Sequence, residues 1–599
     1  MLKLSDFIVN YLENYGVTDV FMVTGGGAMH LNDSFGKSKK IRCICNHHEQ
    51  ASAIAAEGYA RQKQRLAVVN VTTGPGGLNA LNGVFGQWTD SVPVLYVSGQ
   101  VRFDTTVNSS PAASKLRQLG DQEVRIVDCV KPITKYAKTV TDPMEIRKEL
   151  EKAIYIATHG RPGPVWLDIP MNVQGSMIDE QNLMGFQPEA ISTDAKKLEI
   201  EVDKTIELIF QAKRPVIVAG HGIRISNTIE TFYRIISKLQ IPVLSTLNGF
   251  DIIESHHPLS VGTIGSIGSR AGNFAIQNAD LVIFLGTRNN IRQISYNWTA
   301  FTRAAKKICV DIDQAELEKP FLKYDLSICQ NLNEFLPAFE HKLAIAKYDY
   351  SDWLSWCIKR KGKYNPVLDS YKDLGDCVNP YYFMEQLTTL LPEGAVVVTG
   401  DATACITYFQ AGKIKKNQRV IWNSGCASMG YDLPASIGAC IAENNDVVCL
   451  AGDGSLQMNI QELMTVSYHR LPIKLFYLNN DGYISMKQTQ DNFFGRRIGA
   501  NTDSGIGFPD ITAIAQAYKL PVAKISTDKD LSDQIAKVLS MKGPVICEVI
   551  LPKEYVFAPK LSSERKPDGR LVTKPMEDMF PFLDREEFKQ NMIIPIMHD

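Results

Sequence analysis

Short runs of β-branched and other apolar residues recur along this chain, and a longer stretch with helical spacing follows each one. Five of them are LAVVNV (66–71), VPVLYVSG (92–99), RPVIVAG (214–220), DLVIFLG (280–286) and DVVCLAG (446–452). Strands that read as continuous apolar runs are buried on both faces, because helices cover both sides of a parallel sheet. The alternation therefore predicts an α/β fold built from doubly wound parallel sheets.

Two of the strand–helix–strand units share one layout. LAVVNV leads through TTGPGGLNALNGVFGQWTD into VPVLYVSG, and VVCLA leads through GDGSLQMNIQELMTVSYHR into LPIKLFYLNN. Each unit has a Gly-x-Gly turn after its first strand and a proline before its second. Gly74 and Pro93 are 19 positions apart, and Gly452 and Pro472 are 20 positions apart. The match predicts two related α/β domains that flank a third.

Breaker residues indicate where these domains end. At 599 residues the chain is roughly four times as long as a domain of about 150 residues. Breakers cluster at GRPGP (160–164) with the polar stretch after it, and again at about 345–380. We predict an N-terminal domain (1–178), a central domain (195–345), a C-terminal domain (375–556) and an extended arm (557–599).

The balance of charge argues against several classes of partner. The 64 Lys and Arg residues nearly match the 65 Asp and Glu residues, which gives a formal net charge of -1. No bulk electrostatic field therefore favours nucleic acid or an anionic membrane. The 12 cysteines include no Cys-x-x-Cys pair, and charged residues interrupt the apolar N-terminal segment. We expect a cytoplasmic protein with reduced thiols, without a signal peptide or a membrane span.

Only the second repeated unit carries polar groups suited to a metal at its strand ends. Asp453 lies in the turn after the first strand, and Asn480 follows the returning strand, 27 positions later. Both strand ends open on the same edge of a parallel sheet, so these side chains can converge. With a backbone carbonyl at Gly482 they would give Mg²⁺ three hard oxygen ligands. Each sequence alone also suits a plain turn, and it is the pairing that favours the metal site.

In this arrangement the GDG and NN sequences resemble the diphosphate and magnesium motif of thiamine diphosphate (ThDP) enzymes. The chain resembles their acetolactate synthase-like large subunit branch over nearly its whole length. Further matching stretches are NHHEQASAIAAEGYAR (46–61), TGPGGLNAL (73–81), DSVPVLYVSGQV (90–101), GRPGPVWLDIP (160–170), HPLSVGTIG (257–265), VDID (310–313) and GCASMGYDLPASIGA (425–439).

The resemblance implies an architecture and an assembly. The first domain would bind the aminopyrimidine of ThDP, and the third would bind its diphosphate with Mg²⁺. In this family the cofactor lies between one such domain and its counterpart on a partner subunit. We therefore expect at least a homodimer, with a homotetramer as the alternative.

The resemblance also implies catalytic residues. Glu49 would hydrogen-bond to N1′ of the aminopyrimidine and favour the imino tautomer whose N4′ removes the C2 proton. Asn46 and Glu49 also have the spacing of a capping box that starts a helix, and both functions can hold together. Gln122 matches a family glutamine near the reacting centre, and Met429 matches a bulky apolar residue under the bend of ThDP. His47 or His48 could reach the substrate, although a structural histidine is the alternative for each.

Further positions follow from the resemblance alone. The cofactor-binding residues it implies are Gly25, Thr73, Gly74 and Asn79 in the first domain, and Thr403, Ala404, Gly425, Ser428, Met429, Gly452, Asp453, Gly454, Ser455, Asn480, Gly482 and Tyr483 in the third. The implied metal ligands are Asp453, Asn480 and Gly482.

Departures from acetolactate synthases lie around the acceptor side. Those enzymes carry phenylalanine where Asp121 stands, lysine at Met171, Gln-His at Ala404-Cys405, and tryptophan near Thr489. They bind a non-redox flavin (FAD) with an Arg-Phe-Asp-Asp-Arg segment, where this chain reads GTRNNIRQISYNW (286–298). Arg288, Asn273 and the 262–268 stretch are retained in type, so FAD stays an open alternative.

These observations predict a ThDP- and Mg²⁺-dependent carboligase. It would decarboxylate a 2-oxo acid such as pyruvate and transfer the acyl unit to a carbonyl acceptor, with a nucleotide-linked keto-sugar as one candidate. The alternatives are acetolactate synthase itself, a simple 2-oxo acid decarboxylase or lyase, and a non-catalytic ThDP-binding subunit.

Overall fold

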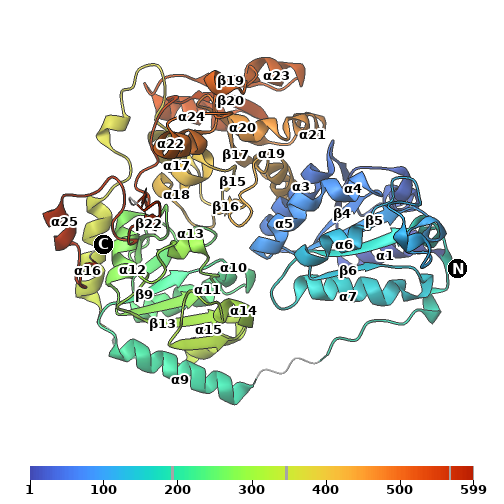
Figure 1. The fold of residues 1–599 in the computed structure, drawn as a ribbon, viewed down its shortest axis with the longest axis horizontal. Helices are drawn as coiled ribbons and strands as arrows, with labels where there is room; N and C mark the ends of the chain where they lie inside the picture. Colours follow the sequence, from blue (N-terminus) through green and yellow to red (C-terminus); the bar gives the residue numbers. More distant parts are fainter. Residues whose placement is uncertain (190–193, 344–348, 566–567, 598–599) are drawn as a thin grey trace.

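Three six-stranded parallel sheets, each covered by helices, build the computed structural model (Figure 1). The structure describes residues 1–189, 194–343, 349–565 and 568–597. The predicted end of the central domain at residue 345 lies outside these ranges. The predicted fold class, three doubly wound α/β domains, is confirmed.

The first and third sheets have the same strand order. The N-terminal sheet runs β3 (Arg42–Cys45), β2 (Asp19–Met22), β4 (Ala67–Val71), β5 (Val94–Gln100), β7 (Val165–Pro170), β6 (Tyr136–Thr139). The C-terminal sheet runs β16 (Arg419–Ile421), β15 (Val396–Thr399), β17 (Val447–Gly452), β18 (Ile473–Asn479), β20 (Val545–Ile550), β19 (Val522–Ile525). In chain order both sheets read 2-1-3-4-6-5, as expected of related domains. The two repeated units contribute β4 with β5 and β17 with β18, the central pair of each sheet.

The central sheet has another order. It runs β11 (Ser260–Thr263), β10 (Val243–Ser245), β9 (Pro215–Ala219), β12 (Leu281–Leu285), β13 (Lys306–Asp311), β14 (Leu326–Cys329). In chain order this is 3-2-1-4-5-6, whose direction reverses beside β9. Open parallel sheets bind ligands outside the carboxyl ends of their strands at such a reversal.

Helices cover both faces of each sheet. The longer ones are α1 (Leu4–Tyr15), α3 (Glu49–Lys63), α5 (Leu81–Asp90) and α7 (Ile146–Thr158) in the first domain; α9 (Ala195–Gln211), α11 (Ile229–Leu239), α12 (Arg270–Asn278), α15 (Leu332–Lys342) and α16 (Ser351–Lys363) around the second; and α17 (Pro380–Leu390), α18 (Thr403–Ala411), α19 (Asp432–Glu443), α22 (Ile484–Phe494) and α24 (Leu531–Ser540) in the third.

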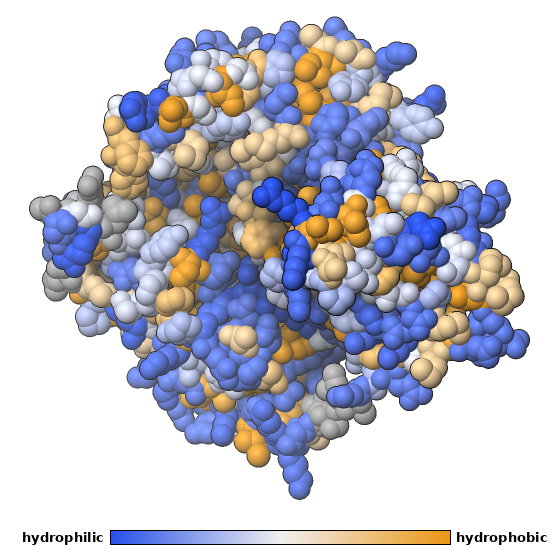
Figure 2. All heavy atoms as spheres, turned by 45° about the vertical axis from the view of Figure 1, so that its right-hand side comes forward, coloured by the Kyte–Doolittle hydropathy of each residue, from blue (hydrophilic) through white to orange (hydrophobic). Residues whose placement is uncertain are grey.

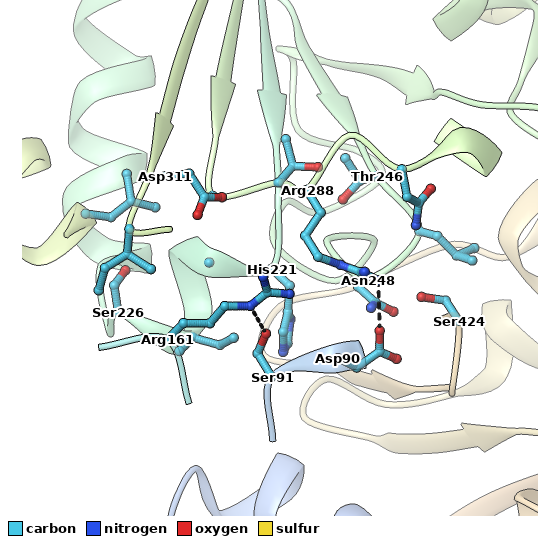
Figure 3. A pocket seen from close by; sticks show the side chains of 18 of the residues that line it. Asp90, Ser91, Arg161, His221, Ser226, Thr246, Asn248, Arg288, Asp311 and Ser424 are labelled. Atoms are coloured by element: carbon cyan, nitrogen blue, oxygen red, sulfur yellow. Dashed lines mark hydrogen bonds and ion pairs between the residues drawn. The ribbon is translucent and has the colours of Figure 1, made fainter. Parts of the chain in front are cut away.

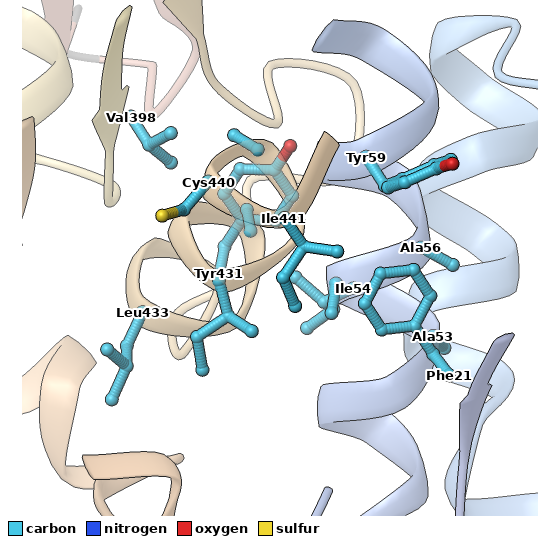
Figure 4. Close-up of a cluster of buried hydrophobic side chains, with 14 of the residues drawn as sticks. Phe21, Ala53, Ile54, Ala56, Tyr59, Val398, Tyr431, Leu433, Cys440 and Ile441 are labelled. Carbon is cyan, nitrogen blue, oxygen red and sulfur yellow. The ribbon is translucent and has the colours of Figure 1, made fainter. Parts of the chain in front are cut away.

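Helices α3 and α19 join the first and third domains along a shared hydrophobic core (Figures 1 and 4). A Cβ atom at Gly58 would lie 2.1 Å from the carbonyl oxygen of Ala435, and one at Gly438 would lie 1.8 Å from that of Ala55. Each helix therefore places a glycine against the backbone of the other. This reciprocal contact is what two related halves make when a local two-fold axis passes between them.

The C-terminal arm lies along the central domain, close to α12 and α16 (Figure 1). Glu577 accepts a hydrogen bond from Gln277 (Nε2–Oε2 2.6 Å) and forms an ion pair with Arg303 (Nη1–Oε1 2.8 Å). Asn278 donates to the backbone oxygen of Asn591 (Nδ2–O 3.0 Å). Side chains of the central domain thus satisfy polar groups of the arm.

The outer surface is mainly hydrophilic on the face drawn in Figure 2, with scattered apolar residues and a hollow near its middle. Among the described residues, no helix combines the length and the apolar character needed to cross a bilayer.

Candidate active site

The three predicted metal residues lie together at the edge of the C-terminal sheet. Asp453 begins α20 (Asp453–Gln457) directly after β17, and Asn480 follows β18. The Asp453 Oδ2 atom accepts from the backbone nitrogens of Gly482 (2.8 Å) and Asn480 (3.2 Å), and Oδ1 accepts from that of Gly454 (2.7 Å). The Asn480 amide lies 2.9 Å from the Gly482 carbonyl oxygen (Nδ2–O).

The electrostatics of this cluster suit a cation. Asp453 is 2% exposed, and burial raises the pKa of its carboxyl to about 6 despite three backbone donors. A carboxylate, a carboxamide and a backbone carbonyl form the hard-oxygen set that Mg²⁺ prefers. A divalent ion here would offset the desolvation that makes the anion costly. The residues present therefore fit the metal and the diphosphate that the sequence implies.

Gly454 is required by the ring beside it. A Cβ atom at this position would lie 1.9 Å from Cε1 of Tyr483. Gly452, in contrast, has nothing within 4 Å of such an atom. The open side of the turn is therefore at Gly452, while Tyr483 closes the side at Gly454.

The segment 423–430 carries three predicted cofactor-binding residues, Gly425, Ser428 and Met429, all of which are half-buried. At one end, Gly425 N donates to Asp90 (N–Oδ2 3.3 Å). At the other end, Gly430 N donates to the Ser455 hydroxyl (N–Oγ 2.9 Å). Ser455 lies in the helix that Asp453 begins, so the segment is tied to the Asp453 group.

Two further predicted positions lie at the start of α18. The Thr403 hydroxyl hydrogen-bonds to that of Tyr555. Ala404 and Cys405 are 0% and 5% exposed and pack in the hydrophobic core with residues such as Tyr408 and Trp422. Ala404 and Cys405 therefore contribute to core packing and present no charged group at the start of α18.

A second group of predicted residues gathers at the corresponding edge of the N-terminal sheet. Asn79 donates to Glu49 (Nδ2–Oε2 2.9 Å), and no described residue donates a hydrogen bond to the other oxygen of Glu49. The carbonyl oxygen of Gln122 would lie 2.1 Å from a Cβ atom at Gly74. Thr73 donates to the Gly99 carbonyl oxygen (Oγ1–O 3.2 Å). On the neighbouring strand end, a Cβ atom at Gly25 would lie 2.5 Å from Cβ of Thr72.

The capping-box expectation for Asn46 is wrong. Helix α3 begins at Glu49 and is capped by His48, whose Nδ1 accepts from Gln50 N at 3.1 Å. Asn46 instead donates to Glu462 of the C-terminal domain (Nδ2–Oε2 2.9 Å). The Asn46 side chain therefore bonds to another domain and does not cap the helix. His48 takes the structural role of the cap.

The two groups are separate half-sites. Within the described ranges, no hydrogen bond or ion pair joins the Glu49 group to the Asp453 group. Each half-site lies at the carboxyl edge of its own sheet. A complete site would bring together one half-site of each kind.

A third feature, a cavity of about 380 Å³, lies where all three domains meet (Figure 3). It opens at the carboxyl ends of the central strands, beside the reversal in strand order. Its polar lining includes Asp90, Ser91 and Arg161 of the first domain, His221, Asn248, Arg288, Arg292 and Asp311 of the second, and Ser424 of the third.

Two buried polar atoms in this cavity have no protein partner, namely Nδ1 of His221 and Oδ1 of Asn248. Burial lowers the pKa of His221 to about 3, so the ring is neutral. Sequence patterns indicated Arg288 and the 262–268 stretch, but not Asp90, Arg161 and Asn248, as residues of this region. The Gly-His-Gly at 220–222, directly after β9 at the reversal, was the available signal.

Comparison with known proteins agrees with this architecture. The chain matches the thiamine pyrophosphate enzyme N-terminal TPP binding domain over residues 2–123, the central domain over 202–339 and the C-terminal TPP binding domain over 399–549. Thiamine pyrophosphate (TPP) is another name for ThDP.

Curated relatives match along nearly the whole chain. Acetolactate synthase 2, chloroplastic, of Nicotiana tabacum is 32% identical over 579 residues, which cover 94% of this chain and 84% of that protein. The acetolactate synthase large subunit of Lactococcus lactis is 30% identical over 558 residues, which cover 93% and 94%. This chain therefore belongs to the thiamine pyrophosphate enzyme family, and within it to the enzymes of the acetolactate synthase large subunit type.

Proposed function

We propose that this enzyme is a Mg²⁺-dependent carboligase. It decarboxylates a 2-oxo acid, pyruvate in the first instance, and transfers the acyl unit to a carbonyl acceptor. The observation that carries the proposal is the pair of half-sites, with an activating carboxylate on one sheet edge and a metal-binding set on the other. A chain that had lost turnover would have no need to keep both.

ThDP, when bound, supplies the electron sink that lets a 2-oxo acid lose carbon dioxide. The protein binds and orients this group. Asp453, Asn480 and the Gly482 carbonyl would hold the metal, which would supply positive charge for the diphosphate. The small residues at 452–455 let backbone N–H groups approach the phosphate oxygens. Met429 would pack against the bound cofactor between its two rings.

Glu49 holds a proton at the aminopyrimidine nitrogen N1′. The hydrogen bond from Asn79 fixes one carboxylate oxygen and leaves the other free to face the ring. Because the two half-sites of one chain are separate, Glu49 of a second copy completes the site. We therefore propose a homodimer, or a homotetramer made of two such pairs. The cytoplasmic location stays a prediction from the cysteine pattern.

The acceptor is larger or more polar than a second 2-oxo acid. Asp121 and Gln122 are exposed, and they end a long segment after β5. Glu123 anchors this segment because its Oε1 accepts from Val107 N (2.6 Å) and its Oε2 from Leu119 N (3.0 Å). With Met171 in place of a lysine, this side of the site suits an acceptor such as a nucleotide-linked keto-sugar.

The interdomain cavity binds a phosphate-bearing nucleotide, with FAD as the first candidate. Arg288 and Arg292 provide positive charge, while Arg161 is paired with Asp313 and Glu316. The unpartnered atoms of His221 and Asn248 provide polar contacts. The backbones of Gly222 and Gly286 approach closely, because a Cβ atom at Gly222 would lie 2.7 Å from the Gly286 Cα atom. No side chain from this turn therefore fills the cavity. The unpartnered polar atoms and the close glycine contact both support a cavity that holds a ligand and is not filled by packed side chains.

Product analysis tests the proposal. The purified protein with ThDP, Mg²⁺ and pyruvate should consume pyruvate slowly, and a nucleotide-linked keto-sugar should accelerate consumption and yield a branched product detectable by mass spectrometry. Acetolactate as the sole efficient product would identify an acetolactate synthase. Acetaldehyde that forms whatever acceptor is added would identify a decarboxylase, and ThDP binding without pyruvate consumption would identify a non-catalytic subunit.

A further inference from the structure

Asp90, the last residue of α5, lies where the three domains meet, and its side chain has no exposed surface. Arg61 of α3 donates to it (Nη2–Oδ2 2.8 Å). Arg61 is itself buried and also donates to Glu57 (Nε–Oε1 2.9 Å). The N-terminal domain therefore fixes the position of this carboxylate. Two weaker contacts connect it to the other domains.

The first weak contact leads to the interdomain cavity. Arg288 lies 3.5 Å from Asp90 (Nη2–Oδ1), and its side chain is 29% exposed (Figure 3). A guanidinium group has five N–H donors, and Asp90 is its one side-chain partner among the described residues. Arg288 therefore has N–H donors available for an anion in the cavity. Its 3.5 Å contact with Asp90 is long, so an anion can compete with Asp90 for the guanidinium group.

The second weak contact leads to segment 423–430, which carries predicted cofactor-binding residues. Gly425 N donates to the same carboxylate (N–Oδ2 3.3 Å). A Cβ atom at Gly425 would lie 2.7 Å from Asp90 Oδ1, so the backbone passes directly against this side chain. The far end of the segment is tied to Ser455, next to Asp453. One buried carboxylate thus touches both the cavity and the ThDP-binding segment.

We propose that Asp90 is a positioning residue that couples nucleotide binding in the interdomain cavity to ThDP binding. In a buried environment, charges one contact apart act on each other strongly. A phosphate that binds Arg288 competes with Asp90 for that cation. The charge of Asp90 is then shared between Arg61 and Gly425 N alone, which strengthens the hold on segment 423–430. The coupling is therefore positive.

Thermodynamic linkage makes the test quantitative, because two ligands that are coupled change each other's affinity by the same factor. The dissociation constant of ThDP is measured by titration calorimetry at fixed Mg²⁺, with and without saturating FAD, and that of FAD with and without ThDP. ADP serves as a shorter probe. We expect FAD to tighten ThDP binding at least about fivefold, the lower end of common couplings, and ThDP to tighten FAD binding equally.

Variants locate the coupling. Asp90→Asn and Arg288→Gln should each bring the factor close to one while ThDP still binds. Arg288→Gln protects the test if Asp90→Asn fails to fold, because the Arg288 side chain is partly exposed. Asp311→Asn is the matched control: it alters the cavity on the side opposite Asp90 (Figure 3), so its factor should equal that of the unmodified protein whatever its FAD affinity.

Three outcomes overturn the proposal. They are a factor of one in the unmodified protein, a factor retained in Arg288→Gln, and a failure of both FAD and ADP to bind. A residue that only holds the fold together would lower the thermal unfolding midpoint without changing the factor. The measurement uses no substrate, so it stands independently of which acyl acceptor the enzyme uses.

Discussion

At the scale of single residues, the two carboxylates of the half-sites have different surroundings. Asp453 is buried among backbone donors that fix the position of its carboxylate. Glu49 is half-buried and keeps one oxygen free of protein partners. The first is therefore suited to binding, and the second is suited to exchanging a proton.

Glu49→Gln should separate these two functions. The amide cannot hold the proton at N1′, so we expect pyruvate turnover to fall by about 10²- to 10⁴-fold, the usual range for a lost acid–base group. ThDP affinity, set by the other half-site, should change little. Steady-state pyruvate consumption and ThDP titration measure the two effects. Glu180→Gln, at an exposed position just after the N-terminal domain, is the control. Loss of ThDP binding in Glu49→Gln would contradict this assignment.

Asp168 predicts a pH dependence of stability. It is buried within β7 of the N-terminal sheet, and burial raises the pKa of its carboxyl to about 7 although Ser98 donates to it (Oγ–Oδ1 2.6 Å). Between the unfolded value near 4 and this value the folded chain holds the proton more tightly, so stability falls as pH rises through that window. In Asp168→Asn, the decrease in the free energy of unfolding between pH 5.5 and 7.5 should be smaller by about 2 kcal/mol.

Thermal unfolding at a series of pH values measures this difference. Other buried carboxyls contribute to the same slope in both proteins, so the variant is compared with the unmodified chain at each pH. Parallel curves for the two proteins would show that Asp168 does not titrate in this range.

The convergence of Asp453 and Asn480 could be predicted from the sequence, and the contacts of Asp90 could not. Asp453 and Asn480 belong to one strand–helix–strand unit, whose geometry brings both strand ends to the same edge. Asp90 meets Arg288 and Gly425 across 198 and 335 positions of sequence. Contacts of that range depend on how whole domains pack, which no local pattern encodes. The same holds for Asn46, whose partner Glu462 displaced the expected cap.

At the scale of elements, the repeated strand–helix–strand unit predicted the relation between the outer domains, and the identical strand orders of their sheets confirm it. The order of the central sheet could not be predicted in this way. Its Gly-His-Gly turn after β9 lacks the third glycine of a dinucleotide fingerprint. The strand order depends instead on which face of the sheet each connecting helix packs against. The packing of several strands together determines that face.

Helices α3 and α19 allow a sharp test. Gly58→Ala or Gly438→Ala places a methyl group about 2 Å from a backbone oxygen that cannot move aside locally. We expect each to lower the free energy of unfolding by about 1–3 kcal/mol, as overpacking does. Gly36→Ala in α2 (Met29–Lys37), where nothing lies within 4 Å, should be neutral or stabilising. Urea unfolding measures all three, and a Gly58→Ala chain as stable as Gly36→Ala would contradict the close contact.

At the scale of the whole molecule, separate half-sites predict complementation between chains. Glu49→Gln and Asp453→Asn should each be inactive alone. A dimer that contains one of each has one intact pair of half-sites, so random mixing should restore about a quarter of the unmodified activity. Co-expression with two different affinity tags, followed by pyruvate assay, measures this. A mixture without activity would mean that both half-sites of a working site come from one chain.

The reciprocal glycines also limit how the molecule can open. Two helices whose backbones touch without intervening side chains cannot slide or pivot without losing that fit, so the outer domains do not form a hinge. Access for substrates must then come from surface segments, and the segment anchored by Glu123 contacts Gly74 of the Glu49 half-site through the Gln122 carbonyl oxygen. Release of this segment from the Glu123 carboxylate, and not a rigid-body motion of a domain, would then limit the rate of product release.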